Sequence, residues 1–87
     1  MGKELSSEMI MARCKTDNLA LIKNLNLWGN EITDVSLIRQ MKNLEVLSLS
    51  VNKIATLKDF VNCLKLQELY LRKNNIEDLS EIKYLGA

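Results

Sequence analysis

The 87-residue chain contains no histidine and no proline. Without histidine, the usual general base and the commonest metal ligand are missing. The remaining residues supply no set of nucleophile, base and orienting group, and no glycine-rich phosphate loop is present. We therefore predict a protein that is not an enzyme and that has no cofactor, no metal site and no catalytic residue. The three glycines, Gly2, Gly29 and Gly86, mark no linker, so a single domain is expected.

Other features are scarce as well. The two cysteines do not form a Cys-x-x-Cys motif, which indicates a reducing compartment. No apolar run approaches the length of a membrane helix, and the start lacks the long apolar region of a secretory signal. The net charge is +1, with acids and bases interspersed, so no basic face for nucleic acid is expected. These absences predict a cytoplasmic protein without stable membrane insertion and without a nucleic-acid partner.

What the chain does contain is one pattern at a fixed spacing of 22 residues. The string L/I-x-x-L-x-L-x-x-N-x-I begins at Ile22, again at Leu44 and again at Leu66. Between the strings, apolar residues keep the same spacing in three further columns: Val35, Leu57 and Leu79; Ile38, Phe60 and Ile82; Met41, Cys63 and Leu85. Self-similarity at a constant short period is typical of leucine-rich repeats.

The pattern predicts an α/β leucine-rich repeat solenoid in one domain, residues 1–87. Three 22-residue repeats are expected over 22–43, 44–65 and 66–87, after an N-terminal capping helix and lead-in over 1–21. In each repeat the L-x-L segment should form a strand with its leucines inward, giving a short parallel sheet on the concave side. The repeated asparagines should form a ladder that satisfies backbone groups between the turns: Asn30, Asn52 and Asn74.

The capping helix is expected over residues 1–15, because the first repeat needs a cover with one polar face. Ser6 or Ser7 can cap its start by accepting a hydrogen bond from a free backbone amide. Three apolar residues recur at helical spacing along it: Leu5, Met9 and Ala12.

On the convex side, short helical turns are expected after Thr33-Asp34, after Thr56 and after Asp78, since small polar side chains favour caps. Three pairs of apolar residues should close the core from that side: Val35 and Ile38, Leu57 and Phe60, Leu79 and Ile82. No further repeat or cap follows the third repeat in the sequence. The last strand would therefore be an edge, which predicts association of the chain through its uncapped C-terminal edge.

Function in such a fold is expected on the outward positions of the concave strands. Trp28 is the only tryptophan, and the repeat pattern does not require an aromatic residue there. The predicted partner-binding residues are Trp28, Val46, Tyr70, Arg72, Asn26 and Glu68. An exposed tryptophan near a tyrosine and an arginine has the composition of a binding hot spot. The alternative is that Trp28 packs over the helix or over Ser50 and binds nothing, and that Arg72 is a solvated charge.

Three segments make the chain resemble a particular family: Leu25-Asn26-Leu27-Trp28-Gly29, Ser50-Val51-Asn52 and Tyr70-Leu71-Arg72. They resemble the cilia- and flagella-associated protein 410 family, in its N-terminal repeat part only, over nearly the whole chain. The resemblance implies a protein of the cilium basal body that acts by binding and is needed for cilium assembly. The family's C-terminal helical region, associated with oligomerisation and kinase contact, has no counterpart in this sequence, so no residue is assigned to kinase binding.

The most consistent interpretation is a non-catalytic protein–protein interaction module of ciliary or basal-body type, with a protein partner on the concave face. A phosphatase-regulatory or axonemal dynein-binding repeat protein is the first alternative, and it predicts co-purification with a phosphatase catalytic subunit or a dynein heavy chain. A repeat protein associated with nucleic acid is the second, and the near-neutral charge argues against it.

Overall fold

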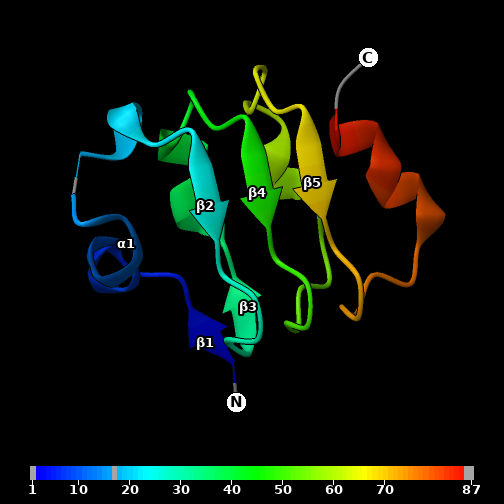
Figure 1. The fold of residues 1–87 in the computed structure, drawn as a ribbon. Helices are drawn as coiled ribbons and strands as arrows, with labels where there is room; N and C mark the ends of the chain where they lie inside the picture. Colours follow the sequence, from blue (N-terminus) through cyan, green and yellow to red (C-terminus); the bar gives the residue numbers. More distant parts are fainter. Residues whose placement is uncertain (1, 17, 86–87) are drawn as a thin grey trace.

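A three-stranded parallel sheet forms the centre of the computed structural model, which describes residues 2–16 and 18–85. Its strands are β2 (Asn24–Asn26), β4 (Val46–Ser48) and β5 (Glu68–Tyr70), side by side in that order (Figure 1). Each strand is displaced from the next by 22 residues, so that Leu25 pairs with Leu47 and Leu47 with Leu69. The predicted α/β class with parallel strands is thereby confirmed.

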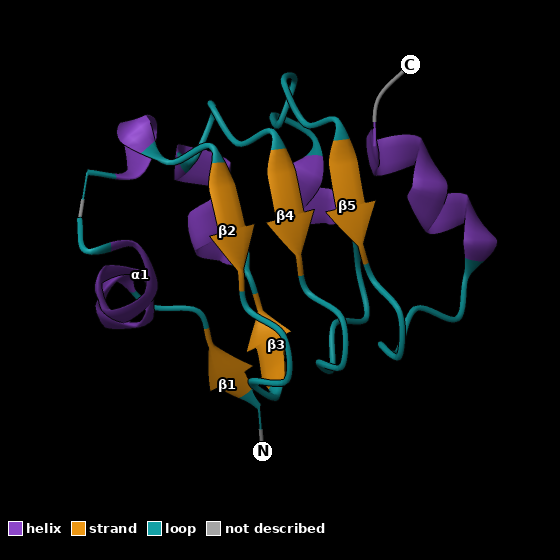
Figure 2. Ribbon diagram, viewed as in Figure 1, coloured by secondary structure: helices purple, strands orange, loops and turns teal. Residues whose placement is uncertain are grey.

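Short helices cover one face of this sheet. The described residues contain four 3₁₀ helices, η1 (Leu19–Leu21), η2 (Ser36–Gln40), η3 (Lys58–Phe60) and η4 (Leu79–Leu85). Figure 2 shows η2 and η3 behind the sheet, while no helix crosses the front face. The α-helix α1 (Ser7–Cys14) lies beside the β2 edge. One sheet face is thus used for packing, and the other is left open.

The core lies between the sheet and the 3₁₀ helices. Leu25, Leu27, Leu47 and Leu49 are at most 3% exposed, whereas the residues between them face outward. The predicted inward orientation of the strand leucines is therefore confirmed. Four residues from the helix side complete this packing: Val35, Ile38, Leu57 and Phe60.

The third pair of convex residues departs from the prediction. Leu79 is 81% exposed and Ile82 is 58% exposed, although Leu57 and Phe60 at the equivalent positions are buried. In a repeat array each turn is covered by the turn that follows it. Within residues 2–16 and 18–85, no turn lies beyond η4 to cover these two side chains.

The N-terminal helix is also shorter than predicted. The helix begins at Ser7 because the Ser6 side chain accepts a hydrogen bond from the backbone N–H of Met9, and this cap fixes the start. It ends at Cys14, followed by Lys15 with a left-handed φ of 61°. Ile10 is fully buried, whereas Ala12 is exposed, so the prediction that Ala12 belongs to the apolar side was wrong.

A second, two-stranded sheet was not predicted. Strand β1 (Lys3–Glu4) pairs in parallel with β3 (Ile32–Asp34), and the Leu5 N–H donates to the Asp34 carbonyl at 2.8 Å. The prediction of a helix over residues 1–15 was therefore wrong for Lys3 and Glu4, which form a strand. Strands of two or three residues carry too little periodicity for a sequence pattern to detect them.

The asparagine ladder is present. The Asn52 side-chain oxygen accepts from the N–H groups of Asn30 and Ile32 at 3.0 Å each, and its amide nitrogen donates to three carbonyls. Asn74 repeats the arrangement one turn on: it accepts from Ile54 and donates to the Leu49 carbonyl. Asn52 and Asn74 thus connect their own turns to the preceding ones, as predicted, whereas among the described residues the Asn30 side chain bonds only within its own turn.

Polar side chains also form hydrogen bonds at the turns on the helix side. The predicted polar residues hydrogen-bond at the start of each turn, since Ser36 donates its N–H to the Asp34 carboxylate at 2.8 Å. In the same way, the Lys58 N–H donates to the Thr56 hydroxyl and the Ser80 N–H donates to the Asp78 carboxylate. The N-cap residues themselves, Val35 of η2 and Leu57 of η3, make no side-chain capping bond. An ion pair of 2.6 Å between Arg39 and the buried Asp59 also connects η2 to η3.

Candidate functional site

The uncovered face of the β2–β4–β5 sheet presents the outward residues of three successive strands. We call it the open sheet face and define it by residues 24, 26, 28, 46, 48, 50, 68, 70 and 72. Trp28 is its largest side chain and is 59% exposed. The Asn26 side-chain oxygen accepts from the Trp28 N–H at 3.0 Å and so fixes the backbone that carries the indole.

Trp28 lies at one end of the open sheet face, where the chain leaves the strands. A hollow of about 320 Å³ opens there between Trp28, Ser50, Val51, Arg72 and Lys73. We call it the Trp28 hollow. The backbone pairing continues to this end, since the Gly29 N–H donates to the Ser50 carbonyl and the Val51 N–H to the Arg72 carbonyl. The hollow is therefore built on a rigid, hydrogen-bonded frame.

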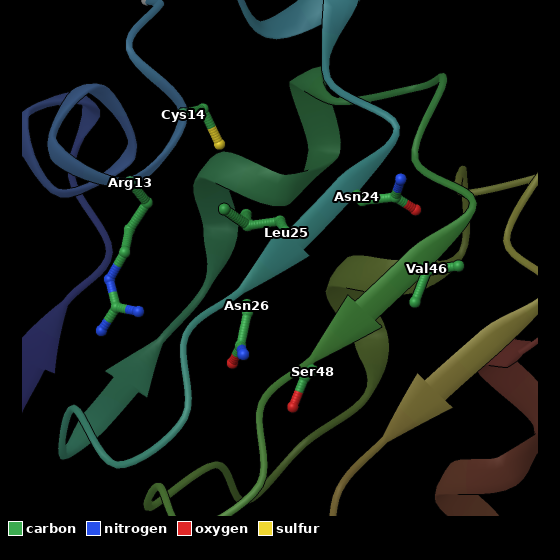
Figure 3. A pocket seen from close by; sticks show the side chains of 7 residues that line it. All are labelled: Arg13, Cys14, Asn24, Leu25, Asn26, Val46 and Ser48. Atoms are coloured by element: carbon green, nitrogen blue, oxygen red, sulfur yellow. The ribbon is translucent and has the colours of Figure 1, made fainter.

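A second hollow, of about 400 Å³, lies between α1 and the sheet (Figure 3). We call it the Arg13 hollow. Arg13 and Cys14 enter it from the end of α1, while the sheet contributes the other side chains: Asn24, Leu25, Asn26, Val46 and Ser48. Its walls are mostly amide, hydroxyl and apolar groups, with the guanidinium as the single cation. Such a surface suits hydrogen bonding to an extended backbone.

Glu68 and Tyr70 interact with each other rather than with either hollow. The Tyr70 hydroxyl donates a hydrogen bond to the Glu68 carboxylate, because the two side chains stand two residues apart on the same face of β5. This bond, together with the negative charge of the carboxylate, raises the pKa of Tyr70. Tyr70 is 49% exposed, so its ring still faces solvent.

The six predicted binding residues thus lie on one face but fall into three groups. Trp28 and Arg72 share one hollow, Asn26 and Val46 share the other, and Glu68 pairs with Tyr70. Whether they bind a partner stays a prediction.

Sequence reasoning missed Arg13, which lines the hollow beside the open sheet face. Its place there depends on how α1 packs against β2, which sequence periodicity does not indicate.

Other polar or reactive groups form no comparable site. Cys63 is buried in the core, and its burial raises the pKa of the thiol. In the part of the chain that the structure describes, no three potential metal-binding side chains gather. None of the helices there is long and apolar enough to cross a membrane.

The fold and the 22-residue register define a leucine-rich repeat protein. The family of leucine-rich repeats (2 copies) matches residues 22–62 and 42–84, and the chain belongs to it. Proteins of this class present an extended surface built from stacked repeats.

The chain is similar to named proteins of the same kind. It is 44% identical to cilia- and flagella-associated protein 410 of Mus musculus and of Homo sapiens, over 94% of this chain. It is 45% identical to an uncharacterized protein of Caenorhabditis elegans over 92% of this chain. The predicted resemblance is therefore confirmed. The chain spans about a third of the length of the mouse and human relatives, 33% and 32%, and 17% of the worm protein.

Solved structures show the same fold. An internalin C2 of Listeria monocytogenes superposes with a TM-score of 0.67 at 34% identity, covering 74% of this chain and 28% of its own. A second internalin of that organism gives a TM-score of 0.74 at 23% identity, covering 97% of this chain and 23% of its own. At that identity the second likeness concerns the fold alone.

Proposed function

We propose that the chain is a non-catalytic protein-interaction module and that the open sheet face, as the concave side of a repeat solenoid, binds its partner. The observation that carries this proposal is Trp28, a large aromatic side chain held 59% exposed on a hydrogen-bonded strand end. Large exposed aromatic groups on rigid surfaces mark contact sites. The proposed contact residues are Trp28, Val46, Tyr70, Arg72, Asn26 and Glu68.

The proposed setting is ciliary. Because the chain is similar to proteins named for cilia and flagella, we place its partner at the basal body or axoneme and its role in cilium assembly. We also propose that the repeats begin at residues 22, 44 and 66 and that α1 acts as their N-terminal cap. Two observations support the cap: Ile10 of α1 is fully buried, and α1 packs against β2.

The test is a pull-down from ciliated-cell extract with the parent chain and a Trp28→Ala/Tyr70→Ala variant. We expect a basal-body or axonemal protein with the parent and its loss with the variant, because two exposed aromatic anchors are removed. Circular dichroism beforehand should show equal folding of both chains, since neither side chain is buried.

A control removes two side chains that are more exposed than Trp28 and Tyr70 and lie away from the open sheet face. Leu21 and Leu64 are 68% and 86% exposed, so Leu21→Ala/Leu64→Ala should retain the partner. If both double variants retrieve the same proteins as the parent, the binding face is misassigned. Recovery of a phosphatase catalytic subunit or a dynein heavy chain would instead identify the alternative class.

A further inference from the structure

Three residues one repeat apart adopt the same unusual backbone at the end of the sheet. Gly29 has a φ of 67°, Val51 of 59° and Lys73 of 59°. Glycine takes this left-handed conformation without steric cost, whereas a β-branched residue rarely does. The equivalent glycine, Gly29, shows that the repeat does not require a valine at this place. The same left-handed φ also occurs at Lys15 and Glu31, so what sets Val51 apart is its β-branched side chain, which makes this conformation costly.

Val51 lines the Trp28 hollow and contributes an isopropyl group to it. It is only partly exposed, because Trp28, Arg72 and Lys73 surround the same hollow. The indole and the valine give this hollow an apolar side. The guanidinium and the ammonium give it a cationic side.

Neither Arg72 nor Lys73 has an internal counter-charge, as is true of every cation in the described part of the chain except Arg39. The one ion pair found among residues 2–16 and 18–85 joins Arg39 to Asp59, between η2 and η3. Glu68, the acid of the open sheet face, already accepts the Tyr70 hydroxyl. A carboxylate supplied from outside would therefore find two available cations beside an apolar surface.

We infer that the Trp28 hollow receives an apolar side chain with a neighbouring Asp or Glu from an extended segment of a partner protein, and that Val51 determines this specificity. The inference rests on the proposed function and names the chemistry of its partner. Trp28, Val51 and Arg72 come from three adjacent strands, which spans about 10 Å at the usual strand spacing. About three extended residues cover that distance, so the acid lies within three positions of the apolar residue.

Selection of random peptides displayed on phage, with removal of those that bind a Trp28→Ala variant, tests the inference. Synthetic copies of the enriched peptides are then titrated, and the fluorescence of Trp28, the only tryptophan, reports binding directly. We expect the enriched sequences to place Asp or Glu within three residues of an aliphatic or aromatic residue. An Arg72→Glu/Lys73→Glu variant should lose these peptides, whereas Lys23→Glu/Lys42→Glu, with the same change in net charge elsewhere, should keep them.

Val51→Gly separates specificity from folding. Glycine relieves the left-handed backbone, so thermal unfolding should occur at the parent's temperature or above it. Peptide affinity should nevertheless fall about tenfold, as for the loss of one apolar contact in a hot spot. Unchanged affinity of this variant overturns the role of Val51.

The remaining outcomes distinguish this inference from the proposed function. One contrary outcome is a set of peptides that require Trp28 but contain no Asp or Glu and that bind the Arg72→Glu/Lys73→Glu variant as tightly as the parent. This outcome overturns the inference and leaves the proposed binding face intact. If no peptide is enriched over the Trp28→Ala background, the inference fails as well. The pull-down with Trp28→Ala/Tyr70→Ala then decides separately whether the face binds a folded partner.

Discussion

Asn52 shows how much a single residue contributes to this fold. It is 6% exposed, and its side chain makes five hydrogen bonds to backbone groups of its own turn and the preceding one. The carbonyls it reaches have other donors, since Asn30 also donates to Leu27 and Asn74 to Leu49. The N–H group of Asn30 has no such second partner among the hydrogen bonds of the described residues. The N–H group of the buried Ile32 also donates to Asn52.

Asn52→Ala should therefore destabilise the chain by about 2–4 kcal/mol, because two amide donors, one of them buried, lose their acceptor. Asn30→Ala is the matched control, since its side chain only donates to the carbonyls of Leu27 and Trp28. It should cost less than about 1.5 kcal/mol. Urea unfolding of both variants measures the difference, and equal losses would show that the ladder does not depend on its central member.

At the scale of elements, the turns are tied together by side chains that reach across repeats. The Glu81 carboxylate of η4 accepts from the Thr56 hydroxyl at 2.6 Å and from the Leu57 N–H at 2.9 Å, at the start of η3. The Thr56 bond, followed by the Leu57 bond, lowers the pKa of Glu81 below its ordinary value of 4.5. The charged form is thus the one that the folded state favours.

It follows that the contribution of Glu81 is complete above the unfolded pKa, near 4.5. It is lost as the pH falls through the lower folded pKa, where the carboxylate takes up a proton. Glu81→Gln keeps an acceptor oxygen but cannot titrate, so its stability should fall less than the parent's on acidification below pH 4.5. Thermal unfolding of both chains over a pH series measures this.

The comparison of the two chains isolates Glu81 from other acids. The pKa values of Asp34 and Asp78 are also lowered, by hydrogen bonds from Ser36 and Ser80, but both acids are present in parent and variant. If the stability of the parent and of the variant changes identically with pH, the hydrogen bonds from Thr56 and Leu57 to Glu81 do not contribute to stability.

Sequence periodicity predicted the strands at this scale but not these cross-links. Leu25, Leu47 and Leu69 follow the period directly, so the sheet and its register could be predicted. The β1–β3 pair could not, because pairing of two residues leaves no periodic signal. The six binding residues were placed on one face, while Arg13 was missed because its position depends on how α1 packs against β2.

Over the whole molecule, burial declines from the centre of the array toward η4. Leu57 is 3% exposed and Leu79, one repeat later in the same column, is 81% exposed. Ile82 of η4, at the same end, is also exposed, at 58%. The predicted association through the C-terminal edge stays a proposal, and these side chains are the surface it would use.

Leu57→Ala should destabilise the chain by about 2–5 kcal/mol, since it leaves a cavity in the core. Leu79→Ala should change stability by less than about 0.5 kcal/mol, because the side chain is largely in solvent already. Chemical denaturation compares the two variants. Sedimentation of Leu79→Ala should show weaker self-association than the parent, and unchanged sedimentation would argue against that edge as a contact surface.

The 22-residue register also has a consequence for how substitutions combine. Along one strand, residues of the open sheet face stand about 6.7 Å apart, whereas across strands their neighbours lie about 4.8 Å away. Within the strands, Asn26 is therefore paired on this face with Ser48, 22 positions along the chain, and lies farther from Asn24. Two substitutions on this face should therefore be coupled more strongly when their positions are one 22-residue period apart than when they are close in sequence on the same strand.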